Sequence, residues 1–400
     1  MACPDRHWPT LLAAVLLLAA PCVAQESQPA EARLRALEAR LRALENQGTV
    51  ADDDTPTGAL DLAGSRVTIK AFADVGFSFQ DPRPAGFAHS AFGFGGIDLF
   101  VTAQLASDFQ ILSETVLEAM DSEVGIDQER IWGQWRLDDA FYAKLGLEHA
   151  PICHFNRRFH HGKWLYPSVE RPLLARFEDD GGILPAHIAG LELGGDAGLL
   201  GGQLEYAAVV GNGRGLTPTD RQITTDRNDA KAVELALAFR PAGGDLAVGV
   251  AGHFDEVPGD HTGATTRILS TRQAIGSAFL DWRLGPIDLT AEGALMEDGD
   301  HTSSHSFHHR VGFVQVALPL ERWTPYARMD ARRMERGDPY FAPMDFDLDR
   351  TEAVLGVRHE FNAQTAIKFE LSAGRAETRI GGNVDRDGFW GFALQLAWGF

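Results

Sequence analysis

Five basic residues gather in one stretch of the chain where they could bind anions. The stretch runs from 150 to 186, and its bases are Arg157, Arg158, Lys163, Arg171 and Arg176. Arginine binds oxyanions through two parallel hydrogen bonds, so this stretch could offer fixed positive charge to small anions. Acidic residues stand nearby, at Glu170 and at 178–180. The alternative is therefore that internal ion pairs only fix the conformation of the stretch.

Two groups of histidines are a second source of chemistry. They are His149, His154, His160, His161 and His187, and then His301, His305, His308 and His309. Histidine is the commonest metal ligand and titrates near neutral pH. However, no cysteine or aspartate spacing completes a recognisable metal site. We therefore favour solvated loop histidines over a metal site or a pH gate.

Enzyme motifs are missing from the sequence. It contains no G-x-S-x-G and no H-E-x-x-H, and the glycine-rich run 211–215 lacks a following Lys-Ser/Thr. A turn explains these glycines better than a phosphate-binding loop. We expect no enzyme and no cofactor, although a hydrolase with catalytic residues far apart in the sequence would escape such a search.

Alternation of apolar and polar residues runs from Arg66 to the end of the chain and predicts an all-β fold. Ile97, Leu99 and Val101 alternate with polar residues, for example, and later segments repeat the scheme. We count roughly sixteen such segments, and single-chain bacterial barrels have an even number of strands. The pattern predicts an antiparallel β-barrel of about 16 strands, wide enough for a water-filled lumen.

The final segment favours a membrane barrel over a soluble sandwich. Its apolar face consists of Trp390, Phe392, Leu394, Leu396, Trp398 and Phe400. Aromatic residues at both ends of an apolar face suit a strand that faces lipid. A strand that ends in Phe400 is similar to the recognition signal of outer-membrane barrels.

Connections of very different length separate these segments. Short turns and long loops on opposite sides are typical of such barrels, and the stretch 150–186 is long enough to fold inward and narrow the pore. Strand parity predicts further inward-facing bases, namely Lys70, Arg136, Lys144, Arg328, Arg332, Arg358 and Lys368. It also predicts competing inward-facing acids, namely Asp74, Asp98, Glu148, Glu205, Asp330, Glu360 and Glu370.

The N-terminal region has a different composition. Residues 1–24 are predicted to be a cleaved signal peptide. An apolar run too short to span a membrane is followed there by a small-residue cleavage pattern, Pro21-Cys22-Val23-Ala24. Within 25–47, leucines at heptad spacing predict a short coiled coil. The composition of 48–65 predicts a linker. The barrel then occupies 66–400. Cys153 would be the one cysteine of the mature chain, and the formal charge of −20 argues against a nucleic-acid partner.

Several elements together carry a family resemblance. They include the strand at Gly146 leading to Pro151, Glu170-Arg171-Pro172, the return strand at Gly190, the turn at Asn212-Gly213, and 226–231. With the coiled coil and Phe400, they make the chain resemble the phosphate-selective porins (porin O and P family) of Gram-negative outer membranes. The resemblance implies a homotrimer of 16-stranded barrels.

From these observations we expect an outer-membrane porin that passes small hydrophilic solutes by passive diffusion, with phosphate or organic acids as the first candidates. Its partners would be outer-membrane lipid, lipopolysaccharide and further copies of the chain. Two alternatives remain. The barrel could anchor an envelope tether that acts through the coiled coil, or it could be an outer-membrane hydrolase.

Overall fold

The computed structural model describes residues 60–62, 65–82, 89–119, 124–159, 162–222, 225–259, 270–300, 305–341, 348–380 and 383–400. The predicted signal peptide and coiled coil, and most of the predicted linker, lie outside these residues. None of the described helices is long and apolar enough to cross a membrane.

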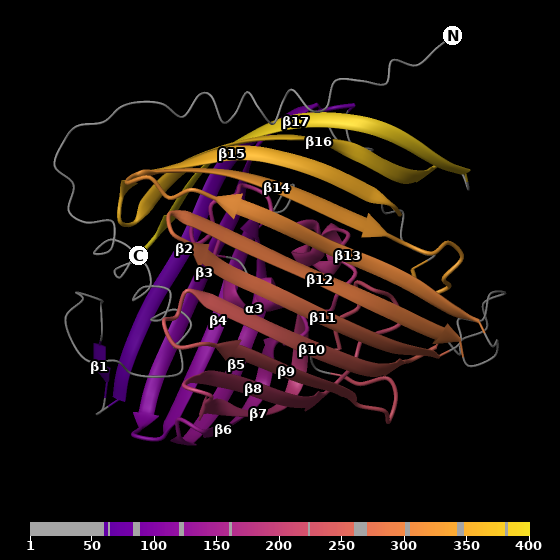
Figure 1. Ribbon diagram of the computed structural model, residues 1–400. Coiled ribbons are helices and arrows are strands. Elements are labelled where there is room, and N and C mark those ends of the chain that lie inside the picture. The colour runs from indigo at the N-terminus through magenta and orange to yellow at the C-terminus, as the bar shows by residue number, and fades with distance from the viewer. Residues whose placement is uncertain are drawn as a thin grey trace, which may run out of the picture. The chain divides into compact units, whose positions relative to one another are not determined.

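A closed antiparallel barrel of 16 strands forms the body of the chain, which confirms the predicted fold class (Figure 1). Each strand from β2 onward pairs with the next, and β17 pairs with β2 to close the ring. A short strand, β1, lies within the segment predicted to be a linker and pairs with the beginning of β2. The strands are β1 (Leu60–Leu62), β2 (Ser65–Asp81), β3 (Ser90–Ala106), β4 (Phe109–Ala119), β5 (Val124–Asp138), β6 (Phe141–His149), β7 (His187–Leu199), β8 (Gly202–Gly211), β9 (Ala232–Arg240), β10 (Leu246–Val257), β11 (Thr271–Leu284), β12 (Ile287–Asp300), β13 (Ser306–Ala317), β14 (Trp323–Arg333), β15 (Arg350–Asn362), β16 (Thr365–Ile380) and β17 (Asn383–Gly399).

The two faces of the wall differ in polarity, as the alternation predicts. On β16, Phe369 and Leu371 are 39% and 46% exposed on the outer face, whereas Lys368 and Glu370 are buried on the inner face. Successive side chains of a strand point to opposite sides, so the apolar set faces outward along the whole segment. The outer surface therefore suits lipid, and the inner surface carries the charges.

Connections alternate between short turns and long loops. The turns at 139–140, 200–201 and 285–286 have two residues each, whereas 150–186, 212–231 and 334–349 are long. Glycines with positive φ serve the turns, as at Gly243 and Gly244 between β9 and β10. Consecutive connections lie at opposite ends of the barrel, so all the long loops lie at one end, which we call the loop side.

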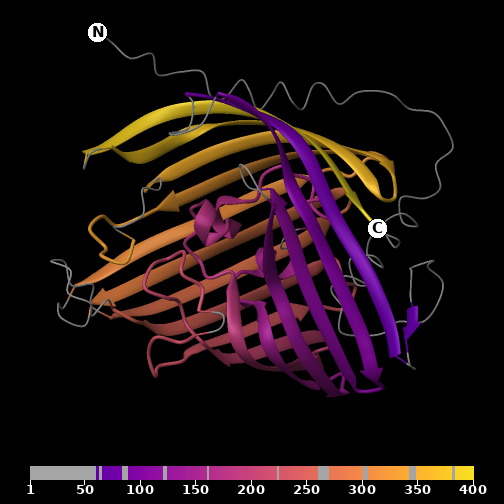
Figure 2. The ribbon, with the colours of Figure 1, turned by 180° about the vertical axis from the view of Figure 1, so that it is seen from behind.

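The connection from β6 to β7, residues 150–186, lies inside the barrel, and we call it the inner segment. It contains α3 (His154–Phe159) and two short 3-10 helices, η1 (Leu173–Ala175) and η2 (Glu178–Asp180). The view from behind shows helical turns of the inner segment, in magenta, between the walls of the barrel (Figure 2). Apolar side chains of the inner segment, such as Phe155 and Leu174, form one buried cluster with wall residues such as Phe313. Burial of these apolar side chains stabilises the inner segment in its position inside the lumen.

Candidate functional site

Inward-facing carboxylates of the wall hold the backbone of the inner segment. Glu292 of β12 accepts hydrogen bonds from the N–H groups of His154 and Phe155, at 2.7 and 2.9 Å. On β16, four strands further along the wall, Glu370 accepts from the Val169 N–H at 2.9 Å. Carboxylates that accept from backbone N–H groups make strong, charge-assisted bonds. In the same way, the Ile152 N–H donates to Glu234 and the Leu173 N–H donates to Asp330.

Predicted inward-facing bases of β14, β15 and β16 bind the same segment through its carbonyl groups. Lys368 donates to the Ser168 carbonyl at 2.8 Å and also to that of Lys163. Arg328 donates to the Glu170 carbonyl at 2.8 Å. Further bonds of this kind join Arg328 to Arg171, Arg358 to Trp164 and Tyr166, and Arg332 to Gly181. These four bases are buried, so they contact the segment rather than bulk water.

The bases of the inner segment are themselves paired with wall acids. Arg157 lies 2.7 Å from Glu192, and Arg158 lies 2.6 Å from Asp281. Lys144 of β6, another predicted pore base, contacts Glu148 at 2.8 Å and Glu192 at 3.3 Å. Ion pairs therefore join the segment to β7 and β11, whereas the ion-pairing alternative from the sequence placed the acidic partners within the stretch itself, at Glu170 and at 178–180.

Arg171 lies deeper in the fold of the inner segment than its other bases. Arg171 is buried, donates to the Ala175 carbonyl at 2.7 Å and stacks its guanidinium 4.0 Å from the ring centre of Phe177. These contacts of Arg171 therefore join parts of the inner segment to one another. Arg176 is half-buried and directly follows η1.

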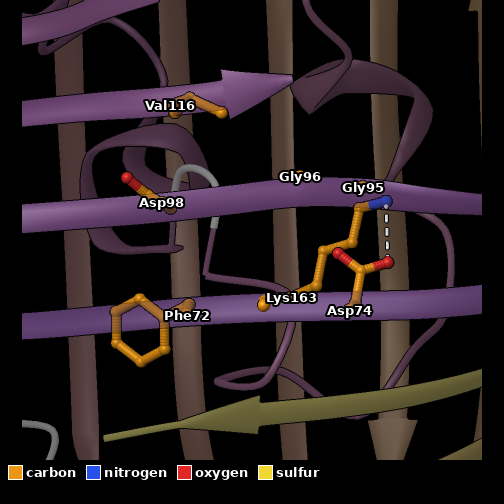
Figure 3. Close-up of a pocket in the computed structure, with 8 residues that line it drawn as sticks. Phe72, Asp74, Gly95, Gly96, Asp98, Val116 and Lys163 are labelled. Carbon is orange, nitrogen blue, oxygen red and sulfur yellow. Dashed lines mark hydrogen bonds and ion pairs between the residues drawn. The ribbon is translucent and has the colours of Figure 1, made fainter. Parts of the chain in front are cut away.

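A small pocket lies where the inner segment meets β2, β3 and β4 (Figure 3). Lys163 reaches from the segment toward Asp74, with its ammonium 3.5 Å from the carboxylate. Gly95 makes room for this pair, because a Cβ there would lie 2.3 Å from an Asp74 oxygen. Both oxygens of the buried Asp98 carboxylate lack a hydrogen-bond partner among the described residues. The pocket thus contains two acids and one base.

Several histidines predicted to be solvated are buried instead. His149 and His309 are almost fully covered, and His187 lies 2.7 Å from the Glu129 carboxylate. His154 stacks on Phe279 with ring centres 3.5 Å apart. The expectation was wrong for His149, His187 and His309 because they lie on β6, β7 and β13 rather than on loops, and their side chains are covered. His154, on α3, is partly buried, whereas His305 and His308 are exposed as expected. His160, His161 and His301 lie outside the described residues.

Burial also controls the titration of two groups on the inner segment. Cys153 is free and fully buried, and burial raises the pKa of its thiol well above the ordinary range. Burial likewise raises the pKa of Tyr166 to about 12. Neither group is ionised near neutral pH, so neither adds charge to the lumen.

Solved structures that are similar to this chain are outer-membrane proteins, which agrees with the barrel fold. No family model matches the chain, and no curated protein matches it. Among solved structures, the outer membrane channel DcaP of Acinetobacter baumannii has a TM-score of 0.58 at 12% identity over 88% of this chain and 100% of that chain. OmpT, an outer membrane protein of Vibrio cholerae, has a TM-score of 0.56 at 13% identity over 86% and 100%.

The chain has the fold of an outer-membrane β-barrel protein. The same OmpT in its trimer form matches with a TM-score of 0.54 at 12% identity, over 84% of this chain and 99% of that chain. At these identities the likeness concerns the fold alone. The resemblance to phosphate-selective porins stays a prediction from the sequence.

Proposed function

We propose that this outer-membrane-type barrel is a channel through which small hydrophilic solutes diffuse passively across a bacterial outer membrane. The observation that carries the proposal is the inner segment, which lies inside a barrel whose inner face is charged and whose outer face is apolar. A segment placed in this way narrows the lumen, so solutes are sorted by size. No covalent chemistry and no cofactor are needed.

Weak charge selectivity is part of the proposal. Ion pairs with acids involve Lys144, Arg157, Arg158, Lys163, Arg328 and Arg358 among the candidate pore bases. A paired base produces a much smaller field in the lumen than a free one, because its partner cancels most of the charge. We therefore favour a channel that admits anions and cations in similar measure over one with the phosphate preference that the family resemblance implies.

Export, assembly and membrane contacts complete the proposal. The predicted signal peptide would direct the chain across the inner membrane, and the barrel would then insert into the outer membrane and contact lipid and lipopolysaccharide. The existence of a trimer form for OmpT supports a homotrimer here. Crosslinking of the detergent-extracted protein tests this part, because a monomer would contradict it.

Single-channel recording tests the channel itself. The mature chain, folded and reconstituted in a planar bilayer under a salt gradient, should give stepwise conductance and a reversal potential close to zero. Deletion of the predicted coiled coil, 25–47, should leave the conductance of each channel unchanged. Silent bilayers from a folded barrel would contradict the channel, and a strongly anion-selective reversal potential would contradict weak selectivity alone.

A further inference from the structure

One histidine and two carboxylates meet in a buried cluster at the loop side of the lumen. Asp298 comes from β12 and His309 from β13, whereas Asp338 belongs to the loop between β14 and β15. One nitrogen of the histidine and one oxygen of each carboxylate lie within 4.8 Å of one another. Three separate parts of the chain thus direct metal-binding atoms to one point.

The Asp298 carboxylate has one oxygen that is not satisfied. Its Oδ1 accepts a hydrogen bond from the Gln273 amide at 3.0 Å. Its Oδ2 is fully buried, has no hydrogen-bond partner among the described residues, and lies 4.0 Å from Nε2 of His309. A buried carboxylate oxygen without a donor costs free energy, and a bound cation would remove that cost.

The other two groups are oriented toward the same point. The Tyr340 N–H donates to Oδ1 of Asp338 at 2.8 Å, and Oδ2 of Asp338 lies 2.7 Å from Nε2 of His309. Nδ1 of His309 accepts from the Glu335 N–H at 3.2 Å, so Nε2 carries the ring proton when no ion is bound. Metal binding at Nε2 would move the ring proton to Nδ1, and the Glu335 N–H would then have to turn away from the protonated Nδ1.

We propose that Asp298, His309 and Asp338 form a binding site for a divalent transition-metal ion, such as Zn²⁺. Three protein ligands of nitrogen and oxygen, with water as the fourth, are a common zinc arrangement. Bonds of about 2.0–2.2 Å require ligand atoms a little over 3 Å apart in a tetrahedron. The two observed separations from Nε2, 2.7 and 4.0 Å, lie on either side of that value, so small side-chain rotations suffice.

Such an ion would connect the wall to a loop that covers the lumen. Asp298 and His309 are wall residues, whereas Asp338 is followed by Tyr340 and Phe341, which are buried in the same cluster as the inner segment. Metal binding would therefore fix the segment 334–341 across the loop side of the barrel. This role does not depend on whether solutes pass through the lumen.

His253 provides a matched control, because it also lies between two carboxylates but in an unsuitable arrangement. Glu234 lies 2.8 Å from Nδ1 of His253, whereas Asp255 lies 4.0 Å from Nε2. The two acids face opposite nitrogens of one ring, so no single ion can reach both together with the histidine. The residue is as buried as His309, which makes His253→Gln a fair control for disturbance of the interior.

The experiment is a calorimetric titration of the full-length folded protein with ZnCl₂ at neutral pH. We expect the wild type and His253→Gln to bind one Zn²⁺ with the same affinity, and His309→Gln and Asp298→Asn to bind it at least about 10-fold more weakly. Gel mobility before and after heating shows whether each variant has folded. Equal affinity of wild type and His309→Gln, or absence of binding to the wild type, would overturn the proposal.

Cobalt supplies a measurement that needs no variant. Co²⁺ added to the wild type should give the intense visible absorption of a site with four or five ligands, and Zn²⁺ should abolish it. A spectrum that matches Co²⁺ in water would overturn the proposal even if the variants failed to fold.

Discussion

The Arg157 guanidinium of the inner segment lies 2.7 Å from the Glu192 carboxylate of β7. The Glu192 side chain is almost completely buried, so this pair is shielded from water on the side of the wall. Glu192 also accepts hydrogen bonds from Tyr142 and Lys144. The inner segment thus shares one buried carboxylate with the barrel strands that precede and follow it.

Replacing Arg157 with Gln should destabilise the barrel. Loss of one partner leaves a buried carboxylate with fewer donors, and because Tyr142 and Lys144 remain, we expect a loss of about 1–3 kcal/mol. Urea unfolding in lipid vesicles measures it. Arg227→Gln is the control, because the pair of Arg227 with Asp220 is largely exposed and worth at most about 1 kcal/mol. Equal losses for both variants would contradict a special role of the buried pair.

Replacing Glu292 with Gln should loosen α3. A glutamine has one acceptor oxygen, so either the His154 or the Phe155 N–H would face an amide donor. We expect trypsin to cut the folded variant after Arg157 or Arg158, where the wild type resists. Glu297→Gln, an exposed change on the same strand, should stay resistant. Resistance of Glu292→Gln would show that this carboxylate is not needed to hold the helix.

A double-mutant cycle at Arg158 and Asp281 tests the weak charge selectivity. Arg158→Gln should move the reversal potential toward cations, because the Asp281 carboxylate, 2.6 Å away, then lacks its guanidinium partner and keeps the contact with the His154 ring. Asp281→Asn should move it toward anions, and the double variant should return to the value of the wild type. If the double variant kept the full shift of either single variant, the result would contradict the explanation that the charges of Arg158 and Asp281 cancel each other.

Cys153 should resist thiol reagents in the folded barrel. The thiolate is the reactive form, and burial raises the pKa of this thiol, so the thiolate is scarce at neutral pH. We expect maleimide labelling of the mature chain to be slower by a factor of about 100 or more in the folded protein than in urea. Rapid labelling of the folded protein would show that the inner segment opens frequently.

Period-two alternation predicted which side chains of the strands point inward. Lys368 and Glu370 lie on the inner face of β16 as their parity requires. A bulge limits this reasoning on β3, where Asp74 faces Gly96 and Val75 faces Phe94, so that Gly95 is skipped. Phe92 and Phe94 are therefore on the outer face together with Ile97, although strict alternation would separate them.

The contacts of the inner segment could not be predicted in the same way. Lys368 binds the carbonyl of Ser168, 200 residues away, and Glu292 binds backbone N–H groups of α3. Backbone groups are present at every residue, so the sequence does not indicate which ones a wall side chain will meet. The burial of His309 depends on the same kind of long-range contact, with Asp338.

The order of the chain has a consequence for how the barrel is assembled. The inner segment follows β6, but wall groups that bind its backbone lie on β9, β11, β12, β14, β15 and β16. The segment can make its native contacts only after nearly all of the wall has been synthesised and brought around it. Filling of the lumen and the last pairing, between β17 and β2, therefore belong to the same late stage of biogenesis.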